Sequence, residues 1–211
     1  MSATTLTERL FDDSDTGPID PCSLFEEWFT LAQESEPNDP HAMALASVDD
    51  DGLPDVRMVL LNQRDARGFC FFTNFESDKG RELLAHPKAA FVMHWKTLRR
   101  QIRVRGPVEV VADKEADAYF STRARVSQIG AHASKQSRPL ANRYALLERV
   151  ETLKKSFRED EPVNRPANWS GFRVIPEVME FWKDGANRLH DRVRFTRTLP
   201  DGQWSRQRLY P

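Results

Sequence analysis

The sequence predicts an α+β fold that is mainly β, with a few helices inserted among antiparallel strands. Short apolar runs bounded by turn residues recur over residues 41–112 and again over 170–209, and such runs are typical of strands. Between these blocks, and ahead of the first, apolar residues recur every three or four positions, as in amphipathic helices. Many antiparallel strands with few inserted helices favour a closed barrel over an open sheet.

The composition excludes several classes of protein. The chain has 211 residues and a formal net charge of −1, from 31 basic and 32 acidic side chains, so no global field attracts nucleic acid or a membrane. The N-terminus lacks the apolar run of a secretory signal, and no apolar run approaches the roughly 20 residues of a membrane helix. Because Cys22 and Cys70 lie far apart, we expect reduced thiols in a cytoplasmic protein.

The first 34 residues divide into an arm and a helix. Residues 1–19 are polar and acidic without a clear period, so we expect a flexible arm ahead of a single domain over 20–211. Asp20 followed by Pro21 has the form of an N-cap with proline in the first turn. Apolar residues then recur at helical spacing, which predicts an amphipathic helix over 21–34.

The next block predicts strands and one short helix. Asp50 to Gly52 is a turn signal between the first two strands. Ser77 has the position of an N-cap, and Pro87 closes the short helix that follows. The expected strands of this block are 41–49, 54–62, 68–75, 89–95 and 100–112.

Helices return after residue 112, and strands close the chain. Asp113 is the expected cap of a helix over 114–124, and an apolar stripe predicts a second helix over 139–157. Residues 125–138 between them read as a polar loop, with a composition typical of function rather than packing. The expected closing strands are 170–175, 177–183, 188–197 and 203–209.

Two polar clusters in the first half of the chain have the chemistry to hold an anion. Arg57 stands at the head of an apolar strand, and its planar guanidinium suits a phosphate. Thr73, Ser77 and Lys79 precede or open a helix, whose N-terminal amides favour anions. The plainer interpretations are a surface arginine and ordinary capping.

Two further clusters lie in the helical block. Tyr119, Arg123 and Ser127 are spaced by four, so they share one face if the helix persists that far. Two hydroxyls and a guanidinium suit a phosphate, although a solvated helix face is the alternative. Gln136 and Ser137 end the polar loop, where loop polarity alone also accounts for them.

The fifth cluster is the motif "RLHDR" at residues 188–192, which follows Trp182. In a strand, Arg188, His190 and Arg192 point to one face. Cations at that spacing repel one another, so the face is solvated, carries salt bridges or meets an anionic ligand.

Other common sites have no support in the sequence. The five histidines show no ligand spacing, no nucleophile elbow is present, and neither dinucleotide nor Walker motifs occur. The clusters suit a protein that holds phosphorylated aromatic molecules while a cofactor supplies the chemistry.

Seven motifs, in this order, closely resemble the pyridoxamine 5′-phosphate oxidase family: "RMVLL", "FTNFESDKGREL", "RRQIRVRG", "DAYFSTR", "SKQSRP", "EFW" and "RLHDR". The resemblance runs from about residue 20 to the closing "RLYP". It implies a split β-barrel homodimer with FMN bound at the subunit interface. It also implies oxidation of pyridoxine or pyridoxamine 5′-phosphate to pyridoxal 5′-phosphate, with hydride passing from the 4′ carbon to the flavin and O2 yielding H2O2.

The resemblance further implies a role for each matching residue. Arg188 and His190 match the family residues over the substrate ring and are the expected catalytic pair. The expected FMN contacts, some reaching across the dimer, are Arg57, Met58, Val59, Leu60, Phe72, Thr73, Lys79, Gln101, Gln136, Ser137, Trp182 and Arg192. The expected substrate-binding residues are Asn62, Tyr119, Arg123, Ser127, Arg188 and His190. No metal is expected.

A few positions depart from the family pattern. Asn62 stands where the family has a lysine at the substrate phosphate, and losing a charged contact of that kind costs about 1.5–3 kcal/mol. Asp78, beside Lys79, stands where the family often has arginine. Val126 and His132 replace an expected glycine and tryptophan. Apart from Asp78, these changes cluster around the substrate rather than the flavin.

Three other functions remain open. A related flavin oxidase acts on a different, unphosphorylated ring, as in phenazine-pathway relatives, although Tyr119, Arg123 and Ser127 resemble a phosphate-binding set. A non-catalytic protein that binds FMN or pyridoxal phosphate would hold its ligand without turnover. A nucleic-acid module built on "RRQIRVR" is disfavoured by the balanced charge.

Overall fold

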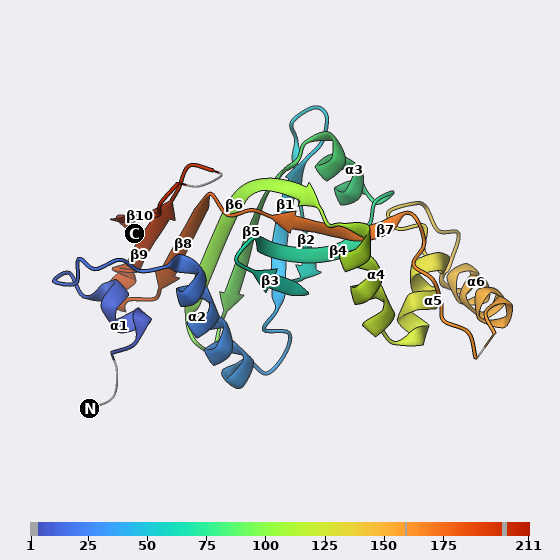
Figure 1. Ribbon diagram of the computed structural model, residues 1–211, viewed down its shortest axis with the longest axis horizontal. Coiled ribbons are helices and arrows are strands. Elements are labelled where there is room, and N and C mark those ends of the chain that lie inside the picture. The colour runs from blue at the N-terminus through green and yellow to red at the C-terminus, as the bar shows by residue number, and fades with distance from the viewer. Residues whose placement is uncertain (1–3, 159, 200–201) are drawn as a thin grey trace.

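A ten-stranded sheet organises the computed structural model, which describes residues 4–158, 160–199 and 202–211 (Figure 1). The strands are β1 (Ala42–Val48), β2 (Pro54–Leu60), β3 (Gln63–Asp65), β4 (Gly68–Asn74), β5 (Lys88–Trp95), β6 (Arg100–Val110), β7 (Trp169–Val174), β8 (Val178–Lys183), β9 (Asp191–Thr196) and β10 (Ser205–Arg208). The helices are α1 (Leu6–Phe11), α2 (Pro21–Ser35), α3 (Asp78–Ala85), α4 (Asp113–Thr122), α5 (Arg125–Ala133), α6 (Arg143–Ser156) and the short 3-10 helix η1 (Ala186–Arg188).

The long strand β6 joins two parts of the sheet. Its first residues pair with β8, whereas Val108 to Val110 pair with β7, which in turn pairs with β4. The main path runs β10-β9-β8-β6-β5-β1-β2, and every pairing is antiparallel. The result is a curled half-barrel with helices around it (Figure 1), which confirms the predicted α+β class.

Helix α2 packs against the inside of the curl and supplies much of the core. Its N-cap is Asp20, as predicted, and its apolar face is fully buried. The Trp28 ring meets Phe181 of β8 edge-on with centroids 5.2 Å apart, and Phe25 meets Phe69 of β4 at 4.8 Å. Edge-to-face aromatic pairs of this kind add to the free energy gained by burial, so α2 ties the two parts of the sheet together.

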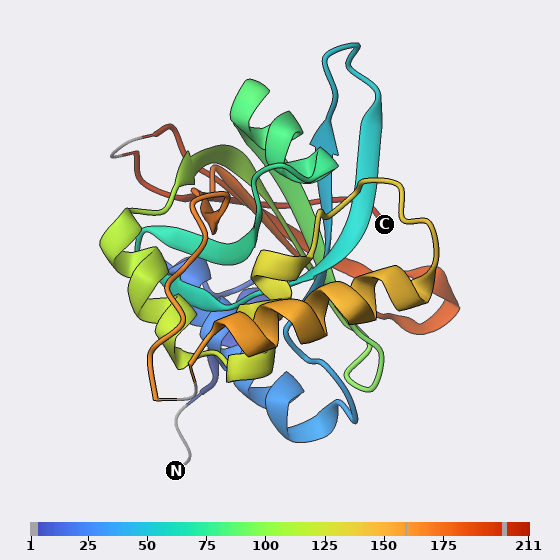
Figure 2. The same ribbon diagram turned by 90° about the vertical axis from the view of Figure 1, so that its right-hand side faces the viewer.

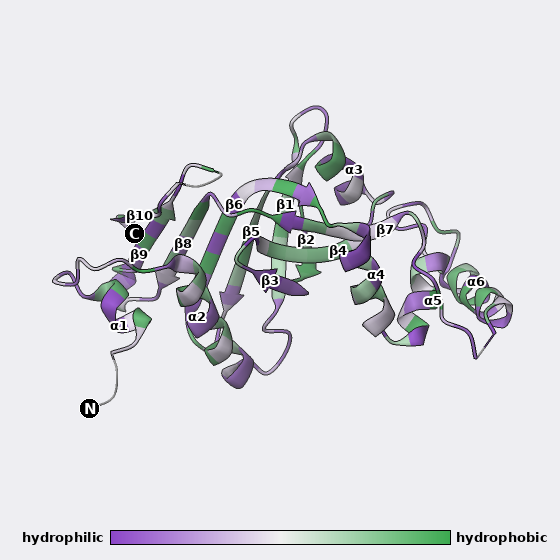
Figure 3. Cartoon of the chain, in the orientation of Figure 1, coloured by the Kyte–Doolittle hydropathy of each residue, from purple (hydrophilic) through white to green (hydrophobic). Residues whose placement is uncertain are grey.

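Most of the remaining helices lie at the two ends of the sheet, whereas α3 lies between them beside β1. Helices α4, α5 and α6 lie at one end, while α1, β9 and β10 lie at the other (Figure 1). Figure 2 shows α6 lying across the first of these ends. Hydrophobic and hydrophilic residues alternate along β5 and β6 (Figure 3), because one side chain in two packs against the core.

The described part of the N-terminal arm contains a helix, α1, although no clear apolar period is present there. Thr5 and Glu8 form a capping box at the start of α1, a local signal that the sequence carries. Glu27 of α2 accepts from the backbone N–H of Leu6 at 2.8 Å, and Trp28 Nε1 donates to Thr7 Oγ1 at 2.7 Å. Flexibility of the arm stays a prediction, and residues 1–3 lie outside the described part.

The helical block differs from prediction in three places. Asp113 is the first residue of α4 rather than its cap, because Ala112 holds the cap position without a side-chain bond. Helix α5 occupies most of the predicted loop, since buried Ile129 and Ala133 stabilise a polar, glycine-containing helix that propensity alone does not favour. Helix α6 begins after its cap Asn142 rather than at residue 139.

Candidate functional site

A pocket of about 600 Å³ lies where β2 and β4 meet α4 and α5. We call it the α4 pocket. The predicted site residues that line it are Met58, Val59, Leu60, Asn62, Phe72, Thr73, Lys79, Tyr119, Arg123, Ser127 and Gln136. The structure thus brings together residues that are up to 78 positions apart, as the span from Met58 to Gln136 shows.

Tyr119, Arg123 and Ser127 line the pocket, but not from one helix. Helix α4 ends at Thr122 and Arg123 is its C-cap with extended backbone, while Ser127 belongs to α5. The helix does not persist to Ser127, so the condition for a single helical face is not met. The turn between the two helices still aims all three residues into the same pocket.

Stacked aromatic rings form one wall of the pocket. The Phe72 and Tyr119 rings lie 4.1 Å apart at an interplanar angle of 12°, and Trp169 stacks on Phe72 at 5.3 Å. The guanidinium of Arg123 lies over Trp169, 4.7 Å from its ring centroid. The sequence did not indicate Trp169, because its position after a linker gave no sign that it would meet α4.

Arg123 carries an unbalanced charge. Its Nη1 is buried without a hydrogen-bond partner, and no described carboxylate lies within ion-pair distance of it. Burial lowers the pKa of Arg123, and the neighbouring Tyr119 offsets part of that effect. Arg123 is half-buried, and a cation partly removed from water without a carboxylate partner is destabilised. This corner of the pocket therefore suits an anion.

Lys79 provides a second cation in the same pocket. It lies in the first turn of α3, whose cap Ser77 accepts from the Gly80 N–H at 3.2 Å. Its Nζ is 3.1 Å from Gln136 Oε1 and 3.5 Å from Thr73 Oγ1, and it forms no ion pair with a described carboxylate. Burial, followed by the charge of Arg57, lowers the pKa of Lys79.

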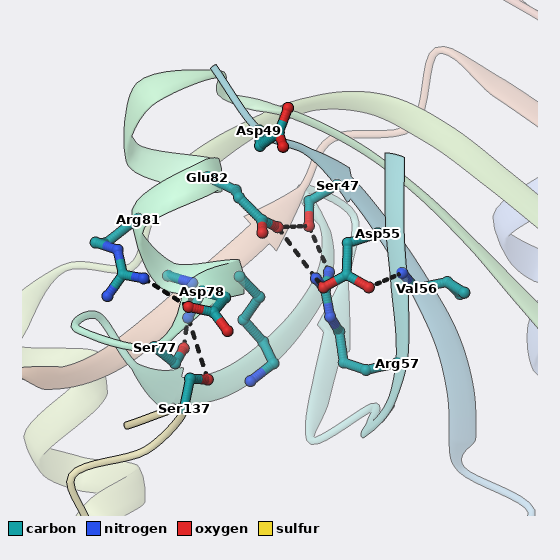
Figure 4. A network of polar contacts seen from close by, with 12 residues as sticks. Ser47, Asp49, Asp55, Val56, Arg57, Ser77, Asp78, Arg81, Glu82 and Ser137 are labelled. Carbon is teal, nitrogen blue, oxygen red and sulfur yellow. Dashed lines mark hydrogen bonds and ion pairs between the residues drawn. The ribbon is translucent and has the colours of Figure 1, made fainter. Parts of the chain in front are cut away.

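Arg57 does not line the pocket. Its guanidinium contacts Ser47, Asp55 and Glu82, with Nη2 3.0 Å from Glu82 Oε2 (Figure 4). Since two carboxylates balance its charge, Arg57 links β2 to β1 and α3 and stands beside the predicted FMN wall rather than in it.

Asp78 and Ser137 meet at the N-terminus of α3. The Asp78 N–H donates to Ser137 Oγ at 3.2 Å, while the Asp78 carboxylate pairs with Arg81 at 2.5 Å (Figure 4). Arg81 therefore balances the acid that departs from the family pattern. This helix start, with Ser137 beside it, remains suited to an anion.

The remaining predicted residues lie around a second hollow. It measures about 710 Å³, and its lining includes Trp182, Arg188 and His190; we call it the β8–η1 hollow. Gln101 of β6 lies opposite Trp182, which lies opposite Arg192 of β9. Within one chain, Gln101, Trp182, Arg188, His190 and Arg192 therefore do not join the α4 pocket.

The motif "RLHDR" does not form one strand, so the prediction of three cations on a strand face is wrong. Asn187 and Arg188 have positive φ, at 54° and 63°, which turns the chain through η1 before β9 begins at Asp191. Of the three predicted cations, only Arg192 lies within the strand. Its Nη2 is 2.8 Å from Oε1 of Glu180, a residue that is 6% exposed, so an internal carboxylate already balances it.

His190 lies just ahead of β9 against polar neighbours. Its Nδ1 is 3.2 Å from the Gly185 N–H, and Asp184 Oδ1 lies 3.2 Å from the same nitrogen. The Trp182 ring lies 4.8 Å from the imidazole centroid. The acceptor role toward Gly185 leaves Nε2 as the ring nitrogen available to a ligand.

Neither a metal cluster nor a membrane span is found in the part of the chain that the structure describes. Over residues 4–158, 160–199 and 202–211, no three histidine, cysteine, aspartate or glutamate side chains gather as metal ligands. Over the same residues, no helix is long and apolar enough to cross a bilayer.

Comparisons with known proteins agree with this architecture. A family model described as pyridoxamine 5′-phosphate oxidase matches residues 29–156, and one described as the pyridoxine 5′-phosphate oxidase C-terminal dimerisation region matches residues 169–211. A pyridoxine/pyridoxamine 5′-phosphate oxidase of Rhizobium leguminosarum is 58% identical over 211 residues, 100% of both chains. One of Azorhizobium caulinodans is 60% identical over 196 residues, 93% of this chain and 92% of the relative.

Solved structures share the fold. PhzG from Burkholderia lata, in complex with tetrahydrophenazine-1-carboxylic acid, matches with a TM-score of 0.85 at 32% identity, over 96% of this chain and 98% of that chain. An FMN-binding protein of Nostoc punctiforme, related to pyridoxamine 5′-phosphate oxidase, matches with a TM-score of 0.74 at 14% identity, over 92% and 100%. The fold is thus the split barrel that the resemblance implied. The two family models and the relatives, which together span nearly the whole sequence, show that this chain belongs to the pyridoxamine 5′-phosphate oxidase family of oxidoreductases.

Proposed function

We propose that the chain is an FMN-dependent oxidase that converts pyridoxine or pyridoxamine 5′-phosphate to pyridoxal 5′-phosphate, with O2 as acceptor and H2O2 as second product. This proposal rests on two cations in one pocket, Lys79 and Arg123. Among the described residues, neither forms an ion pair with a carboxylate. Two separate unbalanced cations beside an aromatic wall suit two phosphorylated ring molecules, a cofactor and a substrate.

The α4 pocket fits FMN at the end that Lys79 occupies. Burial without a counter-ion destabilises the Lys79 ammonium, and a phosphate would relieve that cost. Thr73, Gln136 and Ser137 would add hydrogen bonds there, beside the N-terminus of α3. The flavin ring would lie against strand β2, at the side chains and backbone of Met58, Val59 and Leu60. Bound FMN would supply the two-electron redox chemistry between the substrate's 4′ carbon and O2.

The substrate phosphate would lie at the other cluster. Arg123 would supply the charge, and Tyr119 and Ser127 the hydroxyl groups. The stacked rings of Phe72, Tyr119 and Trp169 exclude water from one side of this corner. A guanidinium held over an aromatic face in this way presents its N–H groups to the ligand with little loss of freedom.

A homodimer would complete the site. Except for Arg99, the residues that line the β8–η1 hollow belong to residues 169–211, the region whose family model is described as a dimerisation region. Strand β2 ends the main sheet path and exposes Val56 and Met58, which are 64% and 63% accessible. Such an apolar edge requires cover. We therefore propose that Gln101, Trp182, Arg188, His190 and Arg192 of the partner subunit face the α4 pocket, with FMN at the interface.

In that dimer, Arg188 and His190 would act on the substrate. Because His190 Nδ1 accepts from Gly185, the neutral imidazole carries its proton on Nε2, which can donate a hydrogen bond to the ligand. Arg188 is exposed and held in a positive-φ turn, which suits a guanidinium that reaches out of its own subunit. Arg192, paired with Glu180, would contact FMN with its remaining N–H groups.

An anaerobic flavin assay tests the proposed function. The FMN-loaded protein is mixed with pyridoxine 5′-phosphate without oxygen, and flavin absorbance is followed before and after air is admitted. We expect bleaching that recovers in air with one H2O2 formed per oxidised substrate. Bound flavin that stays yellow would instead support a non-catalytic binding protein or a different substrate. In the same assay, the variant Arg123→Gln should need more substrate for the same bleaching. Its control is Arg158→Gln, which also removes an arginine charge but at a side chain that is 71% exposed.

A different ring substrate is the second candidate, and one observation favours it. PhzG, which the chain resembles at a TM-score of 0.85, was solved with a phenazine precursor that carries a carboxylate and no phosphate. Asn62, a neutral residue, lines the substrate end of the pocket here. If tetrahydrophenazine-1-carboxylic acid bleaches the flavin faster than pyridoxine 5′-phosphate does, this alternative replaces the first.

A further inference from the structure

Asn62 forms a fixed link between strand β4 and helix α4. It follows β2, and its half-buried side chain lies in the α4 pocket. Asn62 Oδ1 accepts from the Phe72 backbone N–H at 3.2 Å, and Nδ2 donates to Tyr119 Oη at 2.7 Å. Because a backbone N–H can only donate, it selects the oxygen of the amide, and the nitrogen must face Tyr119.

The direction of this second hydrogen bond decides what Tyr119 can offer. An amide NH2 has no acceptor, so the phenol oxygen accepts and the phenol proton points elsewhere. Among the described residues, the Tyr119 hydroxyl makes no other hydrogen bond. Its proton is therefore free for a ligand in the pocket, which Arg123 also lines.

Phe72 and Asn62 together also hold the ring of Tyr119 in place. Phe72 supplies the N–H that orients Asn62, and the Phe72 ring stacks on Tyr119 at 4.1 Å. Stacking fixes the plane of the phenol, and the amide fixes the direction of its lone pair. Burial raises the pKa of Tyr119, which keeps the hydroxyl protonated and able to donate.

We propose that Asn62 is a positioning residue, which acts through Tyr119 by holding its hydroxyl as a hydrogen-bond donor to the substrate phosphate. This inference rests on the proposed function, because it assigns the phosphate to the Tyr119 and Arg123 corner. The phosphate is bound by one guanidinium and oriented neutral donors, so Asn62 affects phosphorylated ligands and not their unphosphorylated counterparts.

A double-mutant cycle separates action through Tyr119 from direct contact. The FMN-loaded protein is titrated with 4-deoxypyridoxine 5′-phosphate, which lacks the oxidisable 4′ oxygen, and with 4-deoxypyridoxine as its matched partner. Dissociation constants are measured for the wild type, Asn62→Ala, Tyr119→Phe and the double variant. We expect Asn62→Ala to weaken the phosphorylated ligand about tenfold and Tyr119→Phe about ten- to hundredfold.

The dissociation constant of the double variant for the phosphorylated ligand decides between the two roles. If Asn62 acts through Tyr119, the double variant binds the phosphorylated ligand within about twofold of Tyr119→Phe alone. If the two losses multiply in full, Asn62 contacts the phosphate independently, and the proposal is overturned. Wild-type protein that binds both ligands equally would instead contradict phosphate recognition, and with it the proposed function.

Asn62→Asp is the variant that keeps the local structure. Its carboxylate still accepts from the Phe72 N–H, so no buried donor is left without a partner. Its second oxygen accepts from Tyr119 and takes the phenol proton away from the pocket. We expect the phosphorylated ligand to weaken at least tenfold, with the unphosphorylated one within about twofold of wild type. Wild-type affinity for the phosphorylated ligand in Asn62→Asp would overturn the proposal.

Discussion

The α4 pocket and the β8–η1 hollow both carry cations, but the two regions balance them differently. In the pocket, Lys79 and Arg123 form no ion pair with a described carboxylate. Next to the hollow, Arg192 pairs with the buried Glu180 and Arg99 pairs with Asp184, while Arg188 in its lining is exposed to solvent. A cation without an internal partner leaves its charge for a ligand, whereas a paired cation stabilises the fold first. Residue type alone does not separate these two roles.

The largest expected effect comes from breaking the ion pair between Arg192 and Glu180. Arg192→Glu would place two carboxylates side by side, because Glu180 is 6% exposed and cannot turn to solvent. Arg103 Nη1 also lies 3.5 Å from Glu180 Oε2 and remains as a partner. The free energy of unfolding should therefore fall by about 3 kcal/mol, the low end of the cost of breaking a buried ion pair, and FMN should be lost. Urea unfolding with and without FMN measures both.

The charge swap Arg192→Glu with Glu180→Arg is the matched control. It should recover part of the unfolding free energy, since the ion pair is restored with its ends exchanged. Wild-type stability and wild-type flavin content in Arg192→Glu alone would remove the distinction between the two regions.

The unpaired cation should behave in the opposite way. Arg123→Gln removes a guanidinium whose Nη1 is buried without a partner, so the unfolding free energy should stay within about 1 kcal/mol of wild type. Binding of a phosphorylated substrate should fall about ten- to hundredfold, because a charge-assisted contact is lost. A large loss of stability in Arg123→Gln would mean that its charge is structural after all.

Arg165 tests whether the α4 pocket depends on the contacts that hold helix α4 and Trp169 in place. Its Nε and Nη2 bind Asp117 and Asp113 of α4 at 2.6 and 2.7 Å, and Nη1 donates to the Trp169 carbonyl at 2.7 Å. Arg165→Ala should lower the unfolding free energy by about 1–2 kcal/mol, since the partner carboxylates are exposed. The substrate KM should rise severalfold while Arg165→Lys recovers part of it. An unchanged KM in Arg165→Ala would show that α4 is held elsewhere.

The smallest expected effect is a pH dependence of FMN affinity. Burial lowers the pKa of Lys79 in the free protein, and a bound phosphate would raise it. The ligand therefore prefers protonated Lys79: affinity is constant below the free-protein pKa and falls severalfold as pH rises through it. Fluorescence titration of FMN between pH 7 and 10.5 measures this, and Lys79→Arg should abolish the fall. The same fall in Lys79→Arg would assign it to another group.

Local chemistry predicted much of the fold. Asp20 and Ser77 cap α2 and α3 as expected, and the main strands fall within a few residues of their predicted bounds. The spacing of apolar residues and the caps of helices depend on contacts within one turn or one strand, so neighbouring residues are enough to predict them. Helix α5 was missed because packing of Ile129 and Ala133, rather than propensity, stabilises it.

The candidate site could be predicted only as a set of residue types. Composition and motif resemblance indicated phosphate-binding groups, and eleven expected residues do line the α4 pocket, from Met58 to Gln136. What each cation does was not readable, because its partner lies far along the chain. Glu82 lies 25 residues from the Arg57 that it pairs with, and Tyr119 lies 57 residues from Asn62.

The sequence by itself determined the α+β class, the caps of α2 and α3 and the presence of phosphate-binding side chains, since these follow from local geometry and residue chemistry. Only the tertiary structure decided that Arg57 and Arg192 are balanced while Lys79 and Arg123 are not. It also decided that Asn62 holds Tyr119, and that the turn at Asn187 and Arg188 breaks the "RLHDR" strand. Charge balance and hydrogen-bond direction depend on which distant segments fold side by side, and no local pattern records that.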